Sequence, residues 1–245
     1  MQRLAPLQES DREEIGRAAI RFARQRPQQV LQWGIDRYRE GITLACSFGA
    51  EDVVLVDMIA RIDPAVPIFY LDTDYLFSET LAVRDRLVER YGVRPIAVRP
   101  EQSIDQQAAR HGADLFNSRP DLCCSIRKVE PLRKHLTRYR SWITGIRRDQ
   151  APARANAGLV EWDSLFNLVK LNPLAPWTSS DVWDYIRAND VPYNELHDRN
   201  YPSIGCRPCT RQVLPGENPR AGRWANFAKQ ECGLHEKTEP APAGS

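Results

Sequence analysis

Short apolar stretches alternate along the chain with longer segments of helical periodicity. The short stretches predict β-strands at residues 41–46, 66–74, 94–99, 141–145 and 166–174. The periodic segments predict α-helices at residues 10–25, 50–62, 78–91 and 123–138, with further helices after Pro27 and after Thr178. Because strands and helices alternate, we expect an α/β fold with a mainly parallel, twisted sheet and helices on both of its faces.

The C-terminal part of the chain has a different character. From about Pro192 it is rich in Pro, Gly and Arg, and we expect it to be irregular apart from a short helix at 221–230. The chain contains no internal repeat and no linker, so we expect a single domain over residues 1–245. Its predicted parts are N-terminal helices at 1–40, an α/β core at 41–205, a cysteine-bearing segment at 206–236 and a disordered tail at 237–245.

Composition narrows the class of protein. The chain has 245 residues, of which 42% are hydrophobic and 27% charged, as in ordinary globular proteins. Its net charge of +2 gives no reason to expect a nucleic-acid or membrane partner. It has no apolar stretch long enough to span a bilayer, and its N-terminus does not resemble a signal peptide. We therefore expect a cytoplasmic protein, in which stable disulfides are rare.

Four of the six cysteines are spaced as metal ligands. Cys206-Arg-Pro-Cys209 is a CxxC motif, and Cys123 and Cys124 are adjacent, which is uncommon in zinc sites. The combination favours a 4Fe–4S cluster, with zinc as the second choice. A redox CxxC motif is disfavoured because no βαβ pattern surrounds it, and four merely buried thiols are the remaining alternative. Cys46 lies in an apolar strand, where we expect it to be buried.

Basic residues accompany the cysteine pair. In a helix, Arg127 and Lys128 lie one turn from Cys123 and Cys124, where they would offset the charge of an anionic cluster or face an anionic ligand. Further arginines gather in two segments, 147–158 and 220–223. They are Arg147, Arg148 and Arg154 in the first segment and Arg220 and Arg223 in the second. Arginine is suited to binding phosphate and sulfate oxygens.

Two neighbouring strands are followed by turns that suit a nucleotide. The tight turn Ser47-Phe48-Gly49 leads into a helix N-terminus, which offers backbone N–H groups to an anion. The second strand ends at Asp72 and Thr73. Parallel sheets bind ligands at the carboxyl ends of their strands, so these residues predict a nucleotide pocket.

Cys232 stands apart from the four-cysteine set. It lies near the C-terminus in KQECGLHE, where Lys229 and His235, three residues to either side, would favour its thiolate. Such a thiol is a candidate nucleophile.

These motifs together resemble one family. The segments SFGAEDVV, LDT, CCSIRKVEPL, GIRRDQAPARAN, YPSIGCRPCT, GRW and KQECGLH are similar to those of the assimilatory adenylyl-sulfate (APS) reductases. That family is grouped with the phosphoadenylyl-sulfate (PAPS) reductases and has an adenine-nucleotide α-hydrolase-like fold. The similarity runs from about residue 41 to residue 236, and it implies that the core at 41–205 binds a nucleotide.

The resemblance implies a chemistry and a set of site residues. Cys123, Cys124, Cys206 and Cys209 would hold one 4Fe–4S cluster per chain, and Cys232 would attack the sulfur of APS. The attack would displace AMP and leave an S-sulfonated cysteine, which thioredoxin would reduce to release sulfite. The implied substrate-binding residues are Ser47, Phe48, Gly49, Leu71, Asp72, Thr73, Lys128, Arg154, Arg220, Arg223 and His235.

One position departs from the family pattern. The family has Gly after LDT, whereas this chain has Asp74, which adopts positive φ less readily.

Three other functions stay open. PAPS is the alternative substrate. A tRNA-thiolating, ATP-using enzyme of similar fold is a second alternative, although it would carry an SGGxDS loop, and near-neutral charge disfavours tRNA. A non-catalytic metal-binding module would leave Cys232 unexplained, and the sequence leaves a homo-oligomer open.

Overall fold

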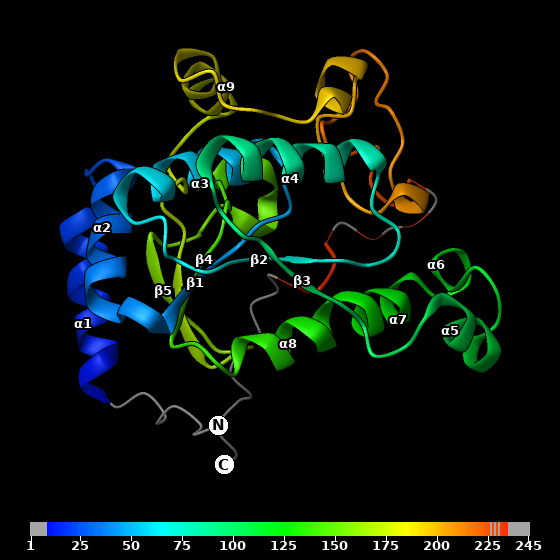
Figure 1. Cartoon of the computed structure of the whole chain (residues 1–245), viewed down its shortest axis with the longest axis horizontal. Coiled ribbons are helices and arrows are strands. Elements are labelled where there is room, and N and C mark those ends of the chain that lie inside the picture. The colour runs from blue at the N-terminus through cyan, green and yellow to red at the C-terminus, as the bar shows by residue number, and fades with distance from the viewer. Residues whose placement is uncertain (1–8, 226, 228, 230, 235–245) are drawn as a thin grey trace.

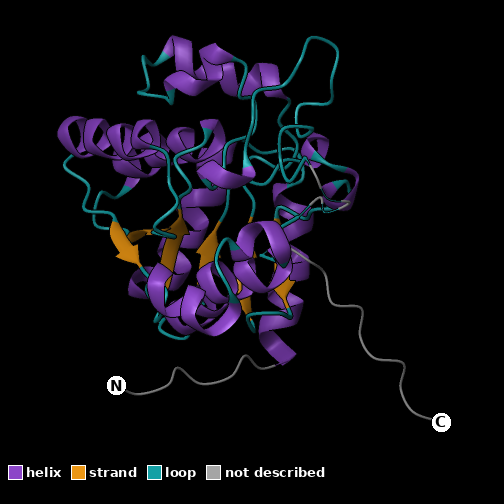
Figure 2. Cartoon of the chain, turned by 90° about the vertical axis from the view of Figure 1, so that its right-hand side faces the viewer, coloured by secondary structure: helices purple, strands orange, loops and turns teal. Residues whose placement is uncertain are grey.

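A six-stranded sheet lies at the centre of the computed structural model, with helices on both faces (Figures 1 and 2). The structure describes residues 9–225, 227, 229 and 231–234. The strands are β1 (Ile42–Ala45), β2 (Ile68–Leu71), β3 (Ile96–Val98), β4 (Ser141–Ile143), β5 (Val160–Asp163) and β6 (Leu168–Leu171). The α-helices are α1 (Glu9–Phe22), α2 (Pro27–Tyr38), α3 (Ala50–Ile62), α4 (Ser78–Tyr91), α5 (Ile104–His111), α6 (Leu115–Ser118), α7 (Pro120–Cys124), α8 (Glu130–Leu136) and α9 (Ser179–Ala188).

The strand order places the first strand in the middle of the sheet. The order is β3-β2-β1-β4-β6-β5, and every pair is parallel except β5 with β6. The chain therefore runs outward from β1 to β3 on one side and continues on the other side at β4. A crevice forms outside the carboxyl ends of the strands where the order reverses in this way. The ends of β1, β2 and β4 consequently surround the candidate site.

The mainly parallel α/β fold is confirmed, with three differences in detail. A sixth strand, β5, forms an antiparallel pair with β6, and helices α5 and α6 occupy a stretch where the pattern predicts no element. The short helix predicted at 221–230 is wrong for the described residues of that stretch. They form turns, and Arg223 makes an isolated antiparallel bridge with Thr210.

Side chains alternate between two apolar layers across the sheet. Ile68 and Tyr70 of β2 belong to the larger core, which α2, α3, α4 and α9 help to build, whereas Phe69 packs on the side of α8. In Figure 1, α3 and α4 run above the sheet and α8 runs below it. Within the described residues, no helix combines the length and the apolar character that crossing a bilayer requires.

Local sequence explains where several elements begin. Thr178 and Asp181 form the predicted capping box of α9, since the Thr178 hydroxyl accepts a hydrogen bond from the Asp181 N–H and the Asp181 carboxylate accepts one from the Thr178 N–H. Pro27 occupies the first turn of α2, as predicted. The segment predicted as one helix at 123–138 is helical, but a π-helical turn at Ser125–Val129 separates α7 from α8. Such turns are frequent at functional sites.

Candidate active site

The loop after β1 is tight because Phe48, and not the glycine beside it, adopts a left-handed conformation. Phe48 has φ +61° and is buried against Tyr70, with ring centroids 5.2 Å apart. Gly49 has an ordinary φ of −72° and precedes α3 directly. The first N–H groups of α3 therefore point toward the crevice without intrahelical partners. That an anion binds at this helix N-terminus stays a prediction from the sequence.

A buried carboxylate, Asp52, holds this loop closed. Its Oδ2 accepts hydrogen bonds from the Ser47 N–H at 2.5 Å and from the Ser47 hydroxyl at 2.6 Å. Burial raises the pKa of Asp52 to about 6, although the bonds from Ser47 act in the opposite direction. A Cβ on Gly145, just beyond β4, would lie 2.3 Å from Oδ1 of Asp52. Glycine at position 145 thus permits the close approach of β4 to the loop.

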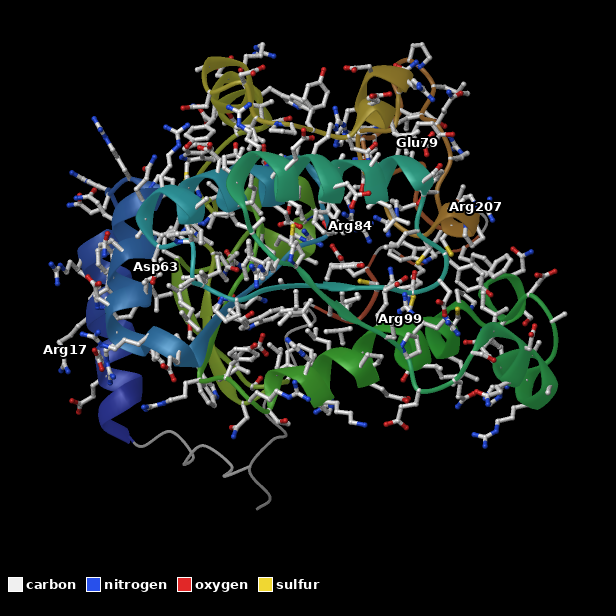
Figure 3. All side chains as sticks on the ribbon, viewed as in Figure 1. Arg17, Asp63, Glu79, Arg84, Arg99 and Arg207 are labelled. Atoms are coloured by element: carbon white, nitrogen blue, oxygen red, sulfur yellow. The ribbon has the colours of Figure 1, made fainter. Side chains whose placement is uncertain are left out.

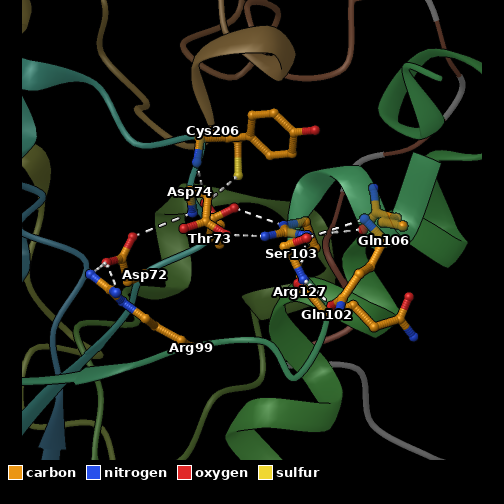
Figure 4. Close-up of polar contacts among 11 residues, drawn as sticks. Asp72, Thr73, Asp74, Arg99, Gln102, Ser103, Gln106, Arg127 and Cys206 are labelled. Atoms are coloured by element: carbon orange, nitrogen blue, oxygen red, sulfur yellow. Dashed lines mark hydrogen bonds and ion pairs between the residues drawn. The ribbon is translucent and has the colours of Figure 1, made fainter. Parts of the chain in front are cut away.

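Polar residues after β2 connect the crevice to the cysteine segment. The Thr73 hydroxyl lies 3.3 Å from the Cys206 sulfur, within hydrogen-bond distance for sulfur. Asp72 instead forms an ion pair with Arg99 at 3.0 Å. Figure 4 shows both contacts, with Thr73 pointing toward Cys206 and Asp72 pointing away from it. In Figure 3, Arg207 of the cysteine segment lies on the opposite side of the molecule from Arg17 and Asp63.

Asp74 adopts the left-handed conformation that a glycine would adopt freely. Its φ is +59°, and its carboxylate forms an ion pair with Arg127. The Arg127 side chain is 1% exposed and also donates hydrogen bonds to the carbonyl oxygens of Thr73 (2.7 Å) and Gln102 (3.3 Å) and to Oε1 of Gln107 (3.2 Å). Arg127 therefore serves to tie the β2 turn to the helical segment, rather than to face a ligand as one of its predicted roles required (Figure 4).

A cavity of about 730 Å³ opens at the ends of β1, β2 and β4. Most of the predicted substrate-binding residues line it, together with Cys232. They are Ser47, Phe48, Gly49, Leu71, Thr73, Lys128, Arg154, Arg220 and Arg223. Asp72 is not part of this lining, and His235 lies outside the described residues. A cavity of this volume is in the usual range for a small-molecule or nucleotide ligand.

Two of the predicted arginines share one carboxylate. Arg154 forms a double hydrogen bond with Glu231, from Nε at 2.9 Å and from Nη2 at 2.8 Å. Nη2 of Arg220 lies 3.3 Å from the same carboxylate. Sequence reasoning missed Glu231, although its position directly before Cys232 is a signal that could have found it. Arg223 stacks on Trp224 with 4.4 Å from Cζ to the ring centroid, and its buried Nε finds no acceptor among the described residues.

The first two arginines of the 147–158 loop have structural partners. Arg147 is buried and pairs with Glu51 at 2.8 Å and with Asp149. Arg148 donates a hydrogen bond from Nε to the carbonyl oxygen of Ala157 at 2.9 Å. These two side chains hold the loop against the core, whereas Arg154 pairs with a residue of the C-terminal segment, Glu231.

The four spaced cysteines lie around a second, much smaller cavity. Cys123, Cys124, Cys206 and Cys209 all line it, and its volume is about 10 Å³. In the arrangement of the described residues, no three Cys, His, Asp or Glu side chains are placed to hold a metal ion. Burial raises the pKa of Cys124 to about 12 and that of Cys209 to about 11.

Two further observations bear on whether this cavity suits a sulfur-bridged cluster. The buried indole N–H of Trp224 lines it and meets no hydrogen-bond acceptor among the described residues. Lys128 lines both the small and the large cavity. Burial lowers the pKa of Lys128, but the neighbouring Cys206 and Cys232 outweigh this effect, and the net shift is upward. The cavity thus combines four thiols, the Trp224 N–H without an acceptor and the cation Lys128, which are groups that suit an anionic cluster. The cavity has to widen to hold one.

Cys232 faces different cations from those that its sequence neighbours suggest. Lys128 and Arg220 lie close enough to interact electrostatically with its sulfur. Lys229 instead forms an ion pair with Asp121 at the start of α7 and lies over the Trp224 ring at 5.6 Å from the centroid. The predicted effect of Lys229 on Cys232 stays a prediction. Cys46, in contrast, is 2% exposed, as predicted for a buried apolar residue.

Known proteins share both the sequence and the fold. Residues 41–212 match the family model of the phosphoadenosine phosphosulfate reductase domain. The chain is 47% identical to an adenosine 5'-phosphosulfate reductase of Halalkalibacterium halodurans, over 84% of this chain and 90% of that protein. It is 46% identical to a phosphoadenosine 5'-phosphosulfate reductase of Gloeobacter violaceus, over 85% and 88%.

A solved structure agrees with these relatives. The crystal structure of a phosphoadenylyl-sulfate (PAPS) reductase from Candida auris, in a phosphate complex, superimposes with a TM-score of 0.72 at 29% identity. The match covers 82% of this chain and 97% of that one. Strand order, crevice and sequence therefore agree, and the chain belongs to the phosphoadenosine phosphosulfate reductase domain family.

Proposed function

We propose that this protein reduces adenylyl sulfate to sulfite and AMP, in sulfate assimilation, with electrons from thioredoxin. One observation carries the proposal: a single cavity joins the loop after β1, the cationic side chains of Lys128, Arg154, Arg220 and Arg223, and the thiol of Cys232. A nucleotide site, a set of anion-binding groups and a nucleophile are the three parts that the reaction needs. Free thiols require a reducing compartment, so we place the reaction in the cytoplasm.

The chemistry proceeds in two balanced steps. The thiolate of Cys232 attacks the sulfur of the substrate, an S–S bond forms, and the bond from sulfur to the phosphate oxygen breaks as AMP leaves with the electron pair. A dithiol of thioredoxin then attacks the S-sulfocysteine. Its two thiols become a disulfide, Cys232 returns to its reduced form, and sulfite leaves. The oxidised sulfur of the substrate thus gains two electrons, which the dithiol supplies.

Basic side chains make the first step feasible. An anionic thiolate has to approach a substrate with two negative charges on its phosphosulfate, and the two repel each other. Lys128 and Arg220 interact electrostatically with Cys232 and line the same cavity, so they offset this repulsion. Arg154 and Arg223 supply further donors to the anionic oxygens. Ser47 and the N-terminus of α3 face the phosphate from the other side of the crevice.

We further propose that Cys123, Cys124, Cys206 and Cys209 hold one 4Fe–4S cluster. The four thiols line one cavity with an unsatisfied Trp224 N–H, and the CC and CxxC spacing suits a cubane better than zinc. When bound, the cluster would supply a fixed anionic group beside Lys128 and link α7 to the C-terminal segment. Lys128 belongs to both cavities and would orient its ammonium between cluster and substrate.

Adenylyl sulfate is preferred over its 3'-phosphorylated form for a reason of charge. The relatives carry both names at similar identity, so their names do not decide between the substrates. An additional phosphate needs additional cations. Besides the four proposed cations, Arg147 and Arg187 line the cavity: Arg147 is buried in its ion pair with Glu51, and Arg187, in an exposed pair with Asp184, is the one further arginine of the described lining that an additional phosphate could engage. A tRNA substrate is disfavoured by the near-neutral charge of the chain.

A sulfite-release assay tests the proposal. Purified anaerobically and supplied with reduced thioredoxin, the protein should release sulfite from APS with a kcat/KM at least about tenfold above that for PAPS, roughly the 1.4 kcal/mol of one unpaired charged contact. Equal or faster turnover of PAPS would contradict the substrate choice but not the chemistry. Absence of sulfite with both nucleotides would contradict the proposed function.

A further inference from the structure

A carboxylate from the chain itself occupies the arginines proposed to bind the substrate. Glu231 receives two hydrogen bonds from Arg154, at 2.9 and 2.8 Å. The third nitrogen of that guanidinium, Nη1, donates to Oε1 of Gln150 at 2.5 Å. Every nitrogen of Arg154 therefore already has a partner. The two side chains are only 12% and 11% exposed, so this pair is shielded from water far more than an ordinary surface ion pair.

The same carboxylate reaches a second arginine. Oε2 of Glu231 lies 3.3 Å from Nη2 of Arg220, so one anion bridges Arg154 and Arg220. A carboxylate presents two oxygens to the guanidinium fork in the way that a phosphate or sulfonate does. Glu231 consequently stands where the geometry of the cavity would place oxygens of the phosphosulfate.

Glu231 belongs to the segment that carries the nucleophile. It directly precedes Cys232, and all of these groups line the large cavity. Two other contacts fix the segment: Lys229 pairs with Asp121, and Leu234 packs against an apolar cluster below the sheet. Neither of those two contacts involves a proposed substrate-binding cation, whereas the contact of Glu231 is with two of these cations, Arg154 and Arg220. The position of Cys232 in the absence of substrate is thus coupled to the occupancy of the arginines.

We propose that Glu231 is an internal anion that holds the arginine site in the free protein and exchanges with the phosphosulfate when substrate binds. This inference rests on the proposed function and deepens it. The nitrogens of Arg154 cannot serve both anions at once, and two anions held side by side in a shielded site repel each other. Substrate binding therefore releases the segment before Cys232, and departure of AMP lets Glu231 return. In this scheme Glu231 is a positioning residue that competes with substrate.

A permanent anchor is the alternative role for Glu231. If the carboxylate stayed on the arginines throughout turnover, it would position Cys232 but would not compete with the substrate. The two roles differ in the sign of one measurable effect. Removing the charge of a competitor strengthens substrate binding, because the free site no longer has to be vacated. Removing a permanent anchor leaves binding unchanged or weakens it.

The experiment compares full-length proteins that all carry Cys232→Ser, so that no turnover occurs. Binding of adenylyl sulfate is measured by isothermal titration calorimetry for this parent, for the parent with Glu231→Gln and for the parent with Glu217→Gln. Glu217 is the matched control, since it also forms a double hydrogen bond with an arginine, Arg211 at 2.8 and 3.0 Å, but lies outside the cavity lining. We expect Glu231→Gln to lower the Kd about tenfold, roughly 1.4 kcal/mol, and Glu217→Gln to leave it unchanged.

A second measurement needs no substrate. With Cys232 retained, alkylation by iodoacetamide is followed on its peptide by mass spectrometry. Glu231→Gln should react several-fold faster than wild type, because the segment has lost its ionic contact, and Glu217→Gln should not. If Glu231→Gln bound adenylyl sulfate with the same Kd as its parent, or more weakly, the proposed exchange would be wrong, but the proposed function would stand. If none of the proteins bound adenylyl sulfate, the proposed function would fall and the exchange with it, whereas unchanged alkylation would refute the docking of the segment by Glu231.

Discussion

Replacing Asp74 by glycine should destabilise this protein, although glycine suits the backbone at that position better. Asp74 has φ +59°. The left-handed region costs an ordinary L-residue roughly 1 kcal/mol and Asp somewhat less. Glycine removes that cost but loses more backbone freedom on folding, by roughly 0.5–1 kcal/mol. These two effects nearly cancel, so the side chain decides the sign.

The side chain of Asp74 is the partner of a buried cation. Its carboxylate pairs with Arg127, whose side chain is 1% exposed, while that of Asp74 is 38% exposed. A hydrogen bond to a charged group contributes about 1.5–3 kcal/mol, and partial exposure places this one toward the lower end of that range. We expect Asp74→Gly to lower the free energy of unfolding by about 1–2 kcal/mol and the Tm by about 3–6 °C. Asp74→Asn should fall between wild type and glycine, and Asp74→Ala should be the least stable.

Urea unfolding followed by far-UV circular dichroism measures this series. Asp190→Gly is the matched control. Asp190 also has a left-handed φ, +49°, but its side chain is 99% exposed in its ion pair with Arg90. Because an exposed pair contributes little, that substitution should change stability by no more than about 0.5 kcal/mol. If Asp74→Gly were as stable as wild type, or if both glycine variants shifted equally, the assignment of Arg127 as a buried cation that depends on Asp74 would be wrong.

Three further predictions concern the thiols and the buried carboxylate. Cys232→Ser should lose sulfite release, and wild type mixed with APS alone should gain one SO₃ group on the Cys232 peptide by mass spectrometry; an adduct on Cys46 would contradict the assignment. Anaerobically purified protein should carry about four irons and four sulfides per chain, which Cys209→Ser should remove and Cys46→Ala should retain; stoichiometric zinc in active protein would exclude the cluster. Burial raises the pKa of Asp52 to about 6, so the folded state binds more protons than the unfolded state between about pH 4 and 6. Stability should therefore fall by up to about 3 kcal/mol as pH rises through that window. In thermal scans, Asp52→Asn should show a smaller fall than wild type. If the difference in stability between the two proteins stayed the same across the window, the raised pKa of Asp52 would be wrong.

Local sequence determined the secondary structure and the chemical inventory of this protein. Apolar stretches and helical periodicity reflect interactions between residues close in the chain, so most strands and helices, and the capping box before α9, could be predicted. The CC and CxxC spacing and the isolated Cys232 could be recognised for the same reason. Strand β5 escaped prediction because two of its four residues, Glu161 and Asp163, are acidic, so it is not an apolar stretch, and its pairing with β6 depends on the sheet.

Only the tertiary structure decided which groups meet. The central position of β1, which creates the crevice, follows from how the whole sheet packs and leaves no local trace in the sequence. Arg154 and Glu231 are 77 residues apart, yet they form a shielded pair, and Arg127 turns to Asp74 instead of to a ligand. Long-range pairs of this kind arise because burial requires every charge to find a partner, and the available partner is set by the fold, not by neighbours in the chain.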